Sequence, residues 1–517
     1  MKDKVKDYYQ VLAGLFAALV ICIGVFCYYG AQKEVTFCDE VYSYTIIDVH
    51  GVHIAVRDNK WYTAPEMDKR FSSAEGFDYK DVVEATGWDV HPPVYYLVFK
   101  TVAAMFPRST SKWLGFGTNL LFFIPFLILM YTGLYKISKK VWLSLAFTVL
   151  YGILPGVQGC ALLIRMYMLL ALWLFLFFLQ TWQLEERPEK KRMYLALGVT
   201  TFFGFMTQYY FSIYVVLFSL FWGIDRLRRK EWKQIAAYLG VMIGAVAAST
   251  VVFPKWITHI FFGEKGEASI STLNSWGTFG EEIRSAFSTV GEFVFPGYGV
   301  VYWLILIVIT ILFVRISAPK MKKIKKIFLM HLAAQLLYYC IVAHVMPTVE
   351  SRYFWSVILV QCVMLLFMLV YVLKSYALIE KKQVLTVVLG LTFLYMATAF
   401  MRIELVPYNG IAYRDGRLTM EQYSEVPWIY YGERNWQMHC TAFDCLIPEH
   451  LMFLTDLQTL VYDETMRNSR ALVLYAQSEE AIGELSARLE EISGHQCKVE
   501  KLADRPYNYA YLMTFAD

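Results

Sequence analysis

Two adjacent carboxylates, Asp39 and Glu40, stand in the stretch TFCDEVYSYT, directly after a long apolar segment. A carboxylate can accept a proton from an attacking hydroxyl group. Two adjacent carboxylates could also hold a divalent cation through their oxygen atoms. Taken alone, such a pair is most often two solvated loop acids. A catalytic role for Asp39 and Glu40 is therefore predicted only in combination with the clusters described next.

Four further clusters carry side chains suited to binding phosphate and sugar. They are His91 in DVHPPVYYL, Arg165 and Tyr167 in LIRMYML, Tyr209 and Tyr210 in TQYYF, and Glu350 and Arg352 in VESRYFW. Two arginines can hold a phosphate by charge-assisted hydrogen bonds, and tyrosines can stack on sugar rings. Each cluster also has a simpler interpretation. A single arginine can extend to the lipid headgroups, the His-Pro-Pro run can start a helix, and tyrosines are typical of an aromatic belt.

The composition predicts that membrane-spanning helices position these clusters. The 517 residues are 57% hydrophobic and 18% charged, with a mean hydropathy of +0.42. On a ruler of ~20 residues per crossing, the apolar segments predict about eleven helices. They lie near 9–29, 113–135, 141–158, 163–183, 193–210, 211–224, 235–253, 299–316, 327–346, 353–373 and 383–401. The basic residues occur in short tracts between these segments, which argues against a nucleic-acid-binding protein.

The distribution of lysine and arginine predicts the topology. Short cytoplasmic loops are enriched in these residues. If the short apolar segment Pro92–Phe106 does not cross the membrane, the five basic tracts fall on the same side as Lys2, Lys4 and Lys6. We therefore interpret Pro92–Phe106 as a re-entrant or juxtamembrane segment, and the first apolar run as an uncleaved signal anchor with a cytoplasmic N-terminus. All five candidate clusters then lie on the outer side.

The outer segments are acidic. The loop 31–92 carries six basic and twelve acidic residues, and 402–517 carries ten basic and eighteen acidic residues. The sequence thus predicts a transmembrane catalytic domain, 1–401, whose outer loop is 30–112, and an extracytoplasmic α/β domain, 402–517. In this second domain WIYYG, LMFL, ALVLYA, CKVEKL and AYLMTF are typical of strands, and SEEAIGELSARLEEISG predicts a helix capped by Ser478. Cys440 and Cys445 could form a disulfide in an oxidising exterior.

The order, spacing and sidedness of the clusters over residues 9–400 resemble the integral-membrane glycosyltransferases of the C fold. The resemblance is strongest to the dolichyl-phosphate-mannose–protein mannosyltransferases and the aminoarabinose–lipid A transferases. It implies that Asp39 is the general base and that Glu40 supports it or helps to bind a metal. It also implies that Arg165 and Arg352 hold the lipid phosphate, while His91 and Tyr167 line the site. Family members often carry an arginine just before the second span, where Lys112 is the nearest match here; a lysine binds phosphate only as a point charge.

Together with the sequence features, the resemblance implies a multi-pass protein of the plasma membrane that transfers a hexose or pentose, with inversion, from a polyprenyl-phosphate donor. The acceptor would be a hydroxyl of a cell-envelope glycan, lipid or protein. No cofactor is predicted with certainty, although a divalent cation could assist. A transporter or lipid flippase is the main alternative, and it would place ionisable residues near the middle of spans. Two others are a receptor that uses the acidic tail and a C-fold transferase that uses a pyrophosphate-linked oligosaccharide.

Overall fold

The computed structural model describes residues 2–48, 56–71, 76–107, 109–263, 266–267, 271–272, 276–346, 350–434, 438 and 443–515. The chain divides into two compact units. The first contains residues 1–29, 86–95 and 116–407, and the second contains residues 30–85, 96–115 and 408–517. Each unit therefore combines segments that are far apart in the sequence.

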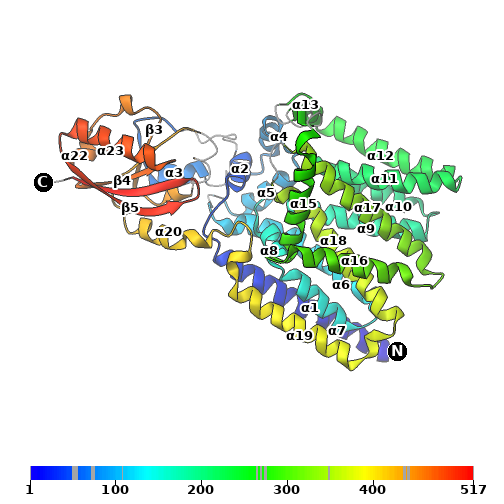
Figure 1. Cartoon of the computed structure of the whole chain (residues 1–517). Coiled ribbons are helices and arrows are strands. Elements are labelled where there is room, and N and C mark those ends of the chain that lie inside the picture. The colour runs from blue at the N-terminus through cyan, green and yellow to red at the C-terminus, as the bar shows by residue number, and fades with distance from the viewer. Residues whose placement is uncertain are drawn as a thin grey trace. The chain divides into compact units, whose positions relative to one another are not determined.

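The first unit is a bundle of apolar helices (Figure 1). Helix α9 packs against α10 and α18, α10 packs against α12, α11 packs against α17, and α7 packs against α19. The helices are α1 (Lys2–Ala31), α6 (Lys112–Ser138), α7 (Val141–Gly152), α8 (Pro155–Leu162), α9 (Tyr167–Glu186), α10 (Lys191–Phe205), α11 (Tyr210–Arg228), α12 (Trp232–Val252), α13 (Lys255–Phe261), α15 (Phe279–Val294), α16 (Gly299–Arg315), α17 (Met321–Val345), α18 (Arg352–Ser375) and α19 (Lys382–Met401).

All eleven predicted apolar segments are helical, but fewer are uninterrupted spans. Among the described residues, seven helices are long and apolar enough to cross a membrane, or up to nine if each bent pair is one span. The pair α7 and α8 is bent by 64°, and the pair formed by α15 and α16 is bent by 87°. Helix α10 has only 15 residues, short of the ~20 that a crossing needs. The chain is a multi-pass membrane protein of predominantly helical fold.

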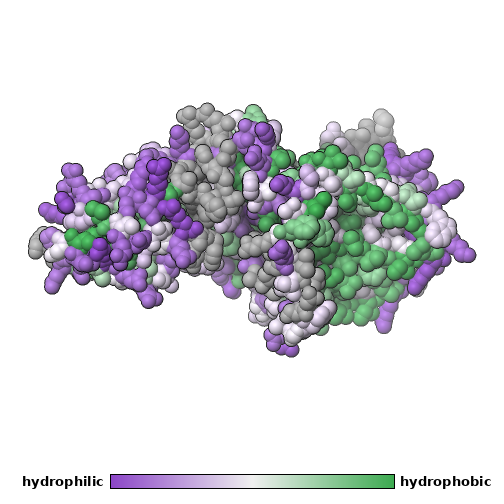
Figure 2. Space-filling model, turned by 90° about the horizontal axis from the view of Figure 1, so that it is seen from above, coloured by the Kyte–Doolittle hydropathy of each residue, from purple (hydrophilic) through white to green (hydrophobic). Residues whose placement is uncertain are grey.

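The surface of the bundle has the polarity expected of a membrane protein. Figure 2 shows hydrophobic side chains over the helices and hydrophilic side chains at the right-hand end of the bundle. Inside, His331 bonds Thr181 Oγ1 at 2.8 Å through Nε2 and the Tyr214 hydroxyl at 2.7 Å through Nδ1. Both ring nitrogens of this fully buried histidine are thus satisfied by neighbouring helices, as burial of polar groups requires.

Two short helices connect the units along the chain. Helix α4 spans Tyr79–Trp88 and α5 spans Val94–Met105. With 12 residues, α5 is about 18 Å long at 1.5 Å per residue, which is shorter than the ~30 Å hydrocarbon core. Its proposed re-entrant or juxtamembrane placement stays a prediction.

The second unit is built on a six-stranded sheet of order β1-β3-β2-β4-β6-β5 (Figure 1). Strand β2 pairs in parallel with β3 and β4, and the other pairs are antiparallel. The elements are α2 (Cys38–Ile47), β1 (Trp61–Thr63), α3 (Ala64–Phe71), α20 (Arg414–Glu421), β2 (Trp428–Tyr431), β3 (His450–Leu454), α22 (Glu464–Arg467), β4 (Ala471–Ala476), α23 (Glu479–Ser493), β5 (Cys497–Arg505) and β6 (Asn508–Phe515).

The α/β character predicted for the C-terminal segment is confirmed. The five predicted strand segments coincide with β2 to β6, and α23 begins after Ser478, whose side chain accepts a hydrogen bond from Ala481 N at 3.0 Å. Gly494 ends this helix with a φ of 72°, a conformation in which glycine carries no Cβ penalty. Cys440 lies outside the described residues, so the predicted pair with Cys445 stays a prediction.

Strand β1 was not predicted. It belongs to the first loop, residues 30–112, and not to the C-terminal segment, residues 402–517. Trp61 to Thr63 pair with Met452 to His450 of β3. Side chains of the first loop also enter the hydrophobic core on one face of the sheet, where Val41, Tyr62 and Met67 pack with Trp428 and other residues. The loop and the C-terminal segment therefore form one folded unit.

Candidate functional site

The segment between α4 and α5 carries a buried acid–histidine pair. Asp89 Oδ2 lies 2.8 Å from His91 Nδ1, and both side chains are largely buried. Burial alone would raise the pKa of the Asp89 carboxyl, but His91 and Arg165 hold this pKa well below its usual range. The two prolines that follow suit the start of α5, and Val94 N donates to Met206 O at 3.2 Å.

Arg165 lies in the tight connection between α8 and α9. Asn119 of α6 holds this connection, because its Nδ2 donates to Ala161 O at 2.8 Å and to Leu163 O at 2.6 Å. The Tyr95 hydroxyl in turn donates to Asn119 Oδ1 at 3.2 Å. Arg165 is only 2% exposed. The backbone of the connection that carries Arg165 is thus held by α6, and Tyr95 of α5 orients the asparagine that holds it.

The side chains of Arg165, His91 and Asp89 form a continuous polar chain. Arg165 Nη2 lies 3.1 Å from His91 Nε2. A guanidinium group can only donate hydrogen bonds, so His91 Nε2 must accept while Nδ1–H donates to Asp89. This network assigns His91 the neutral Nδ1–H tautomer. The ionised Asp89 thereby orients the imidazole, and the imidazole orients the guanidinium.

The start of α18 lies against the start of α9. Arg352 Nη1 donates to Glu350 Oε2 at 3.2 Å, and the Arg352 guanidinium stands 5.4 Å from the centre of the Tyr353 ring. The Tyr353 ring meets the Tyr167 ring edge to face, with a centroid distance of 6.4 Å. The Ser356 hydroxyl donates to Tyr167 O at 2.7 Å. Arg352 therefore lies at the start of α18, and Arg165 lies just before the start of α9, to which the start of α18 is hydrogen-bonded.

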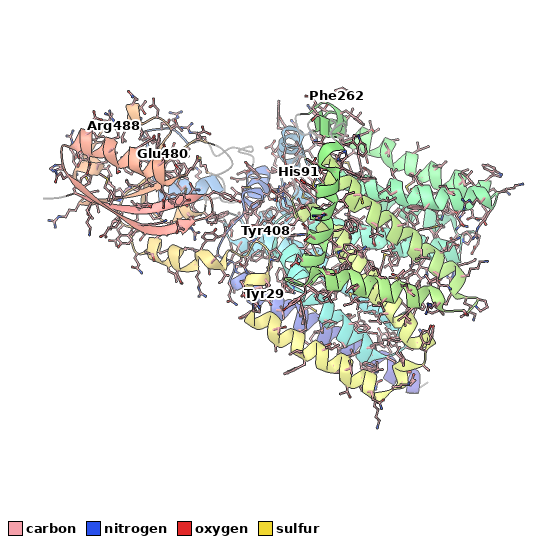
Figure 3. The ribbon with its side chains drawn as sticks, in the orientation of Figure 1. Tyr29, His91, Phe262, Tyr408, Glu480 and Arg488 are labelled. Atoms are coloured by element: carbon pink, nitrogen blue, oxygen red, sulfur yellow. The ribbon has the colours of Figure 1, made fainter. Side chains whose placement is uncertain are left out.

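A cavity of about 220 Å³ opens beside these residues. Its lining includes His91, Gln208, Tyr209, Tyr210, His259 and Tyr353. His259 was not predicted. It lies on the short helix α13, where its Nδ1 is 2.9 Å from the Tyr209 hydroxyl and its Nε2 is 3.2 Å from Gly87 O. Burial lowers the pKa of His259, which favours the neutral ring. Figure 3 labels His91, which enters this cavity from the segment before α5.

The acidic pair lies in the first turn of α2, in the second unit, and its two members differ. Glu40 is completely buried, and its Oε2 accepts a hydrogen bond from Phe37 N at 2.8 Å, which caps the helix. Glu40 Oε1 also pairs with the buried Lys33 Nζ at 2.5 Å. Burial lowers the pKa of Lys33, although Glu40 opposes this shift. Asp39 is only partly buried, and its carbonyl accepts from Ser43 Oγ at 3.1 Å.

Lys112 also belongs to the second unit, at the start of α6. Its Nζ donates to Lys33 O at 2.7 Å and to Ala31 O at 3.2 Å. These bonds tie the beginning of α6 to the segment that follows α1. Within the described residues, no group of three or more histidine, cysteine, aspartate or glutamate side chains could hold a metal ion. Metal binding by Asp39 and Glu40 stays a prediction.

The predicted site residues thus fall into two sets. One region of the first unit holds His91, Arg165, Tyr167, Tyr209, Tyr210, Glu350 and Arg352. The second unit holds Asp39, Glu40 and Lys112. Sequence reasoning did not identify His259 because a single histidine in an apolar segment, ITHIFF, carries no motif. It also did not identify Asn119 or Lys33, whose roles depend on contacts between distant segments.

Comparison with known proteins identifies the fold. No protein-family profile and no curated protein sequence matches the chain. The crystal structure of ArnT from Cupriavidus metallidurans bound to undecaprenyl phosphate matches with a TM-score of 0.52 and 11% sequence identity, covering 96% of this chain and 97% of that chain. The apo structure of the same ArnT gives a TM-score of 0.44 at 10% identity, covering 97% of both chains. The chain has the fold of ArnT, as the resemblance to the C-fold glycosyltransferases predicts.

Proposed function

We propose that this protein is a glycosyltransferase that moves a sugar from a polyprenyl-phosphate donor to an acceptor hydroxyl outside the cytoplasm. The observation that carries the proposal is the polar chain Asp89–His91–Arg165 beside the start of α18, in a chain with the ArnT fold. The ArnT structure with that fold contains undecaprenyl phosphate. A polyprenyl phosphate presents both a phosphate and a long apolar chain to the protein.

Each part of such a donor has a suitable region in the first unit. Arg165 and Arg352 are donor-only, permanently charged groups, suited to the phosphate oxygens. The cavity of about 220 Å³, rich in tyrosine, suits a single sugar ring. A second cavity, of about 560 Å³, is lined by apolar side chains of α7, α16, α18 and α19. It suits the isoprenoid chain, which needs no hydrogen-bonding partner.

For the chemical step, Asp39 is assigned as the general base. It would take the proton of the acceptor hydroxyl while that oxygen attacks the anomeric carbon. The bond between that carbon and the phosphate oxygen breaks, polyprenyl phosphate leaves, and the anomeric centre inverts. Of the two acids, Asp39 suits this role better, because its side chain is partly exposed whereas that of Glu40 is completely buried. The acceptor-facing side of the protein is the outer side that the charge distribution predicts.

The test is to identify the lipid that stays bound to the purified protein. Mass spectrometry of the full chain in mild detergent should find a polyprenyl phosphate or its glycoside on the wild type. The variant Arg165→Lys/Arg352→Lys should retain less of this lipid, and Arg165→Ala/Arg352→Ala should lose it, because lysine keeps the charge without the guanidinium fork. The matched control Arg228→Ala/Arg315→Ala changes two exposed arginines at other helix ends.

Ordinary phospholipids alone on the wild type and on every variant would contradict the proposal. The arginines would then be headgroup anchors, and the transporter and receptor alternatives would become stronger. The buried His331 gives the transporter no support, since both of its ring nitrogens are bonded, to Thr181 and to Tyr214. A loss of lipid from the control variant would mean that the effect is not specific to the site.

A further inference from the structure

A second polar cavity lies at the end of the bundle opposite to Arg165. Helix α9 begins two residues after Arg165 and ends at Glu186, so it is about 30 Å long. The cavity, of about 450 Å³, surrounds the end of this helix. Its charged lining residues are Lys136, Glu186, Arg187, Lys190 and Arg192. The charge distribution predicts that this end of the bundle is cytoplasmic.

The charge of this cavity is unbalanced. Four basic side chains face one carboxylate, Glu186, and the remaining polar lining consists of two glutamines, Gln180 and Gln183. Neighbouring basic residues are neutralised: Arg226 and Lys326 both pair with the buried Glu185. Lys136, Arg187, Lys190 and Arg192 make no such ion pair within the portion of the chain that the structure describes. The cavity is therefore suited to an anion from outside the protein.

The local backbone adds to this preference. Lys190 and Arg192 stand at the start of α10, a helix of 15 residues, and no side chain caps that start. The amide groups at a helix N-terminus carry a partial positive charge that favours phosphate and other anions. The start of α10 and the four basic side chains thus both favour the binding of an anion in this cavity.

The surface next to the cavity is apolar. Leu195, Val199 and Phe203 follow each other at intervals of four residues along α10, so they lie on one face of the helix. They are 66%, 48% and 37% exposed. This stripe leads from the cavity along the apolar surface of the bundle. A ligand that joins a phosphate to hydrocarbon chains would satisfy both regions at once.

We propose that this cavity binds the phosphate group of an anionic phospholipid, with the acyl chains along the stripe Leu195, Val199 and Phe203. Basic pockets between membrane helices on the cytoplasmic side are known to hold lipid headgroups in this way. The site is separate from the proposed sugar-transfer site, since α9 spans the distance between them. It does not depend on the function proposed above.

The test compares two variants of equal charge. Phosphatidylglycerol is titrated onto the full-length protein in detergent, and native mass spectrometry counts the bound lipids. Arg187→Gln/Arg192→Gln removes two charges from the cavity. The control Arg228→Gln/Lys233→Gln removes two exposed charges at the same end of the bundle, outside the cavity. The cavity variant should bind the first lipid at least about tenfold more weakly than the wild type, and the control should be unchanged.

Three results would overturn the proposal. Equal weakening in both variants would mean general surface attraction, and unchanged binding in the cavity variant would mean that the lipid binds elsewhere. Stabilisation of the wild type by millimolar inorganic phosphate, without selective binding of phosphatidylglycerol over phosphatidylcholine, would assign the cavity to a soluble phosphate instead. Thermal melting without added lipid checks folding, which should be unaffected because Arg187 and Arg192 are exposed.

Discussion

At the scale of single residues, the two members of the acidic pair have different surroundings. Glu40 is completely buried, caps α2 and pairs with Lys33, whereas Asp39 is partly exposed. A buried carboxylate that neutralises a buried ammonium group serves the fold first. The two neighbours should therefore be separable by substitution.

Asp39→Asn should abolish sugar transfer but leave both the thermal stability and the bound donor lipid unchanged. The amide keeps the size of the carboxylate but cannot take a proton from the acceptor. Transfer would be measured by release of free polyprenyl phosphate, and donor retention by mass spectrometry. Normal turnover by this variant would rule out Asp39 as the base.

Glu40→Gln should instead lower the stability of the fold. It removes the Glu40 charge from its pair with the buried ammonium group of Lys33, at a cost of about 3 kcal/mol. The melting temperature in detergent would be measured beside that of Asp39→Asn, which serves as the neighbouring control. Equal melting temperatures for the two variants would contradict the structural role of Glu40.

His259 gives a prediction about pH. Burial lowers its pKa below the ordinary value of 6.5, so below that pH the folded protein binds fewer protons than the unfolded chain. The free energy of unfolding must then fall as the pH falls through this window. His259→Gln keeps a donor and an acceptor for Gly87 and Tyr209 but cannot titrate. Its melting temperature should fall less than that of the wild type between about pH 7 and pH 5; parallel curves would show that His259 does not contribute.

At the scale of helices, the apolar cavity of about 560 Å³ between α7, α16, α18 and α19 allows a test of where the isoprenoid chain binds. Leu391 lines this cavity, and Leu389 on the same helix does not. Leu391→Trp should fill the cavity and weaken binding of the polyprenyl donor by at least about tenfold. Leu389→Trp adds the same bulk to the outer surface and should have no effect. Equal donor retention in both variants would place the chain elsewhere.

Most helices were predicted correctly from the length of their apolar segments, and α23 was predicted from its helical pattern and its capping residues. All eleven apolar segments are helical, and Ser478 and Gly494 bound α23 as predicted. By length and composition, seven to nine spans are found among the described residues, against about eleven predicted, and a continuous apolar run did not reveal the 64° break between α7 and α8. Strand β1 has three residues, too few for an alternating pattern to be visible.

The candidate site was predictable to a similar degree. The motifs HPPVYYL, RMYML, QYYF and ESRYFW each pointed to residues that the structure brings together in the first unit. The contacts that position them could not be predicted, because they join distant segments. Asn119 holds the turn before Arg165 across more than forty residues, and Ser356 binds Tyr167 across 189 residues. Neither residue type carries a signal of its own.

At the scale of the whole molecule, the second unit shows that the first loop and the C-terminal segment share one core. Val41, directly after Glu40, packs in the cluster that includes Trp428, and β1 pairs with β3. The helix that carries Asp39 is thus supported by residues from the end of the chain. This arrangement argues against an independent receptor role for the tail, which would lack β1 and part of its core.

Deletion of residues 408–517 should therefore destabilise the loop that contains Asp39. It would expose Val41 and Met67, each worth about 1.5–3 kcal/mol when buried. Limited proteolysis should cut residues 56–71 much faster in the truncated protein than in the full chain. Addition of the separate fragment 408–517 should restore protection if it can still add its strands to β1. Equal protection in the full-length and truncated proteins would contradict a shared core.

The pairing of β1 with β3 also sets an order of events during synthesis. Trp61 and its partner Met452 are about 390 residues apart, which a ribosome covers in roughly 20–80 s. For that time the loop with Asp39 has already been made and its partner strand does not exist. The pairing of β1 can form only after β3, which ends at Leu454, has been translated. A nascent chain that ends before β3 would consequently carry the apolar bundle while the loop that contains Asp39 still lacks the partner of β1.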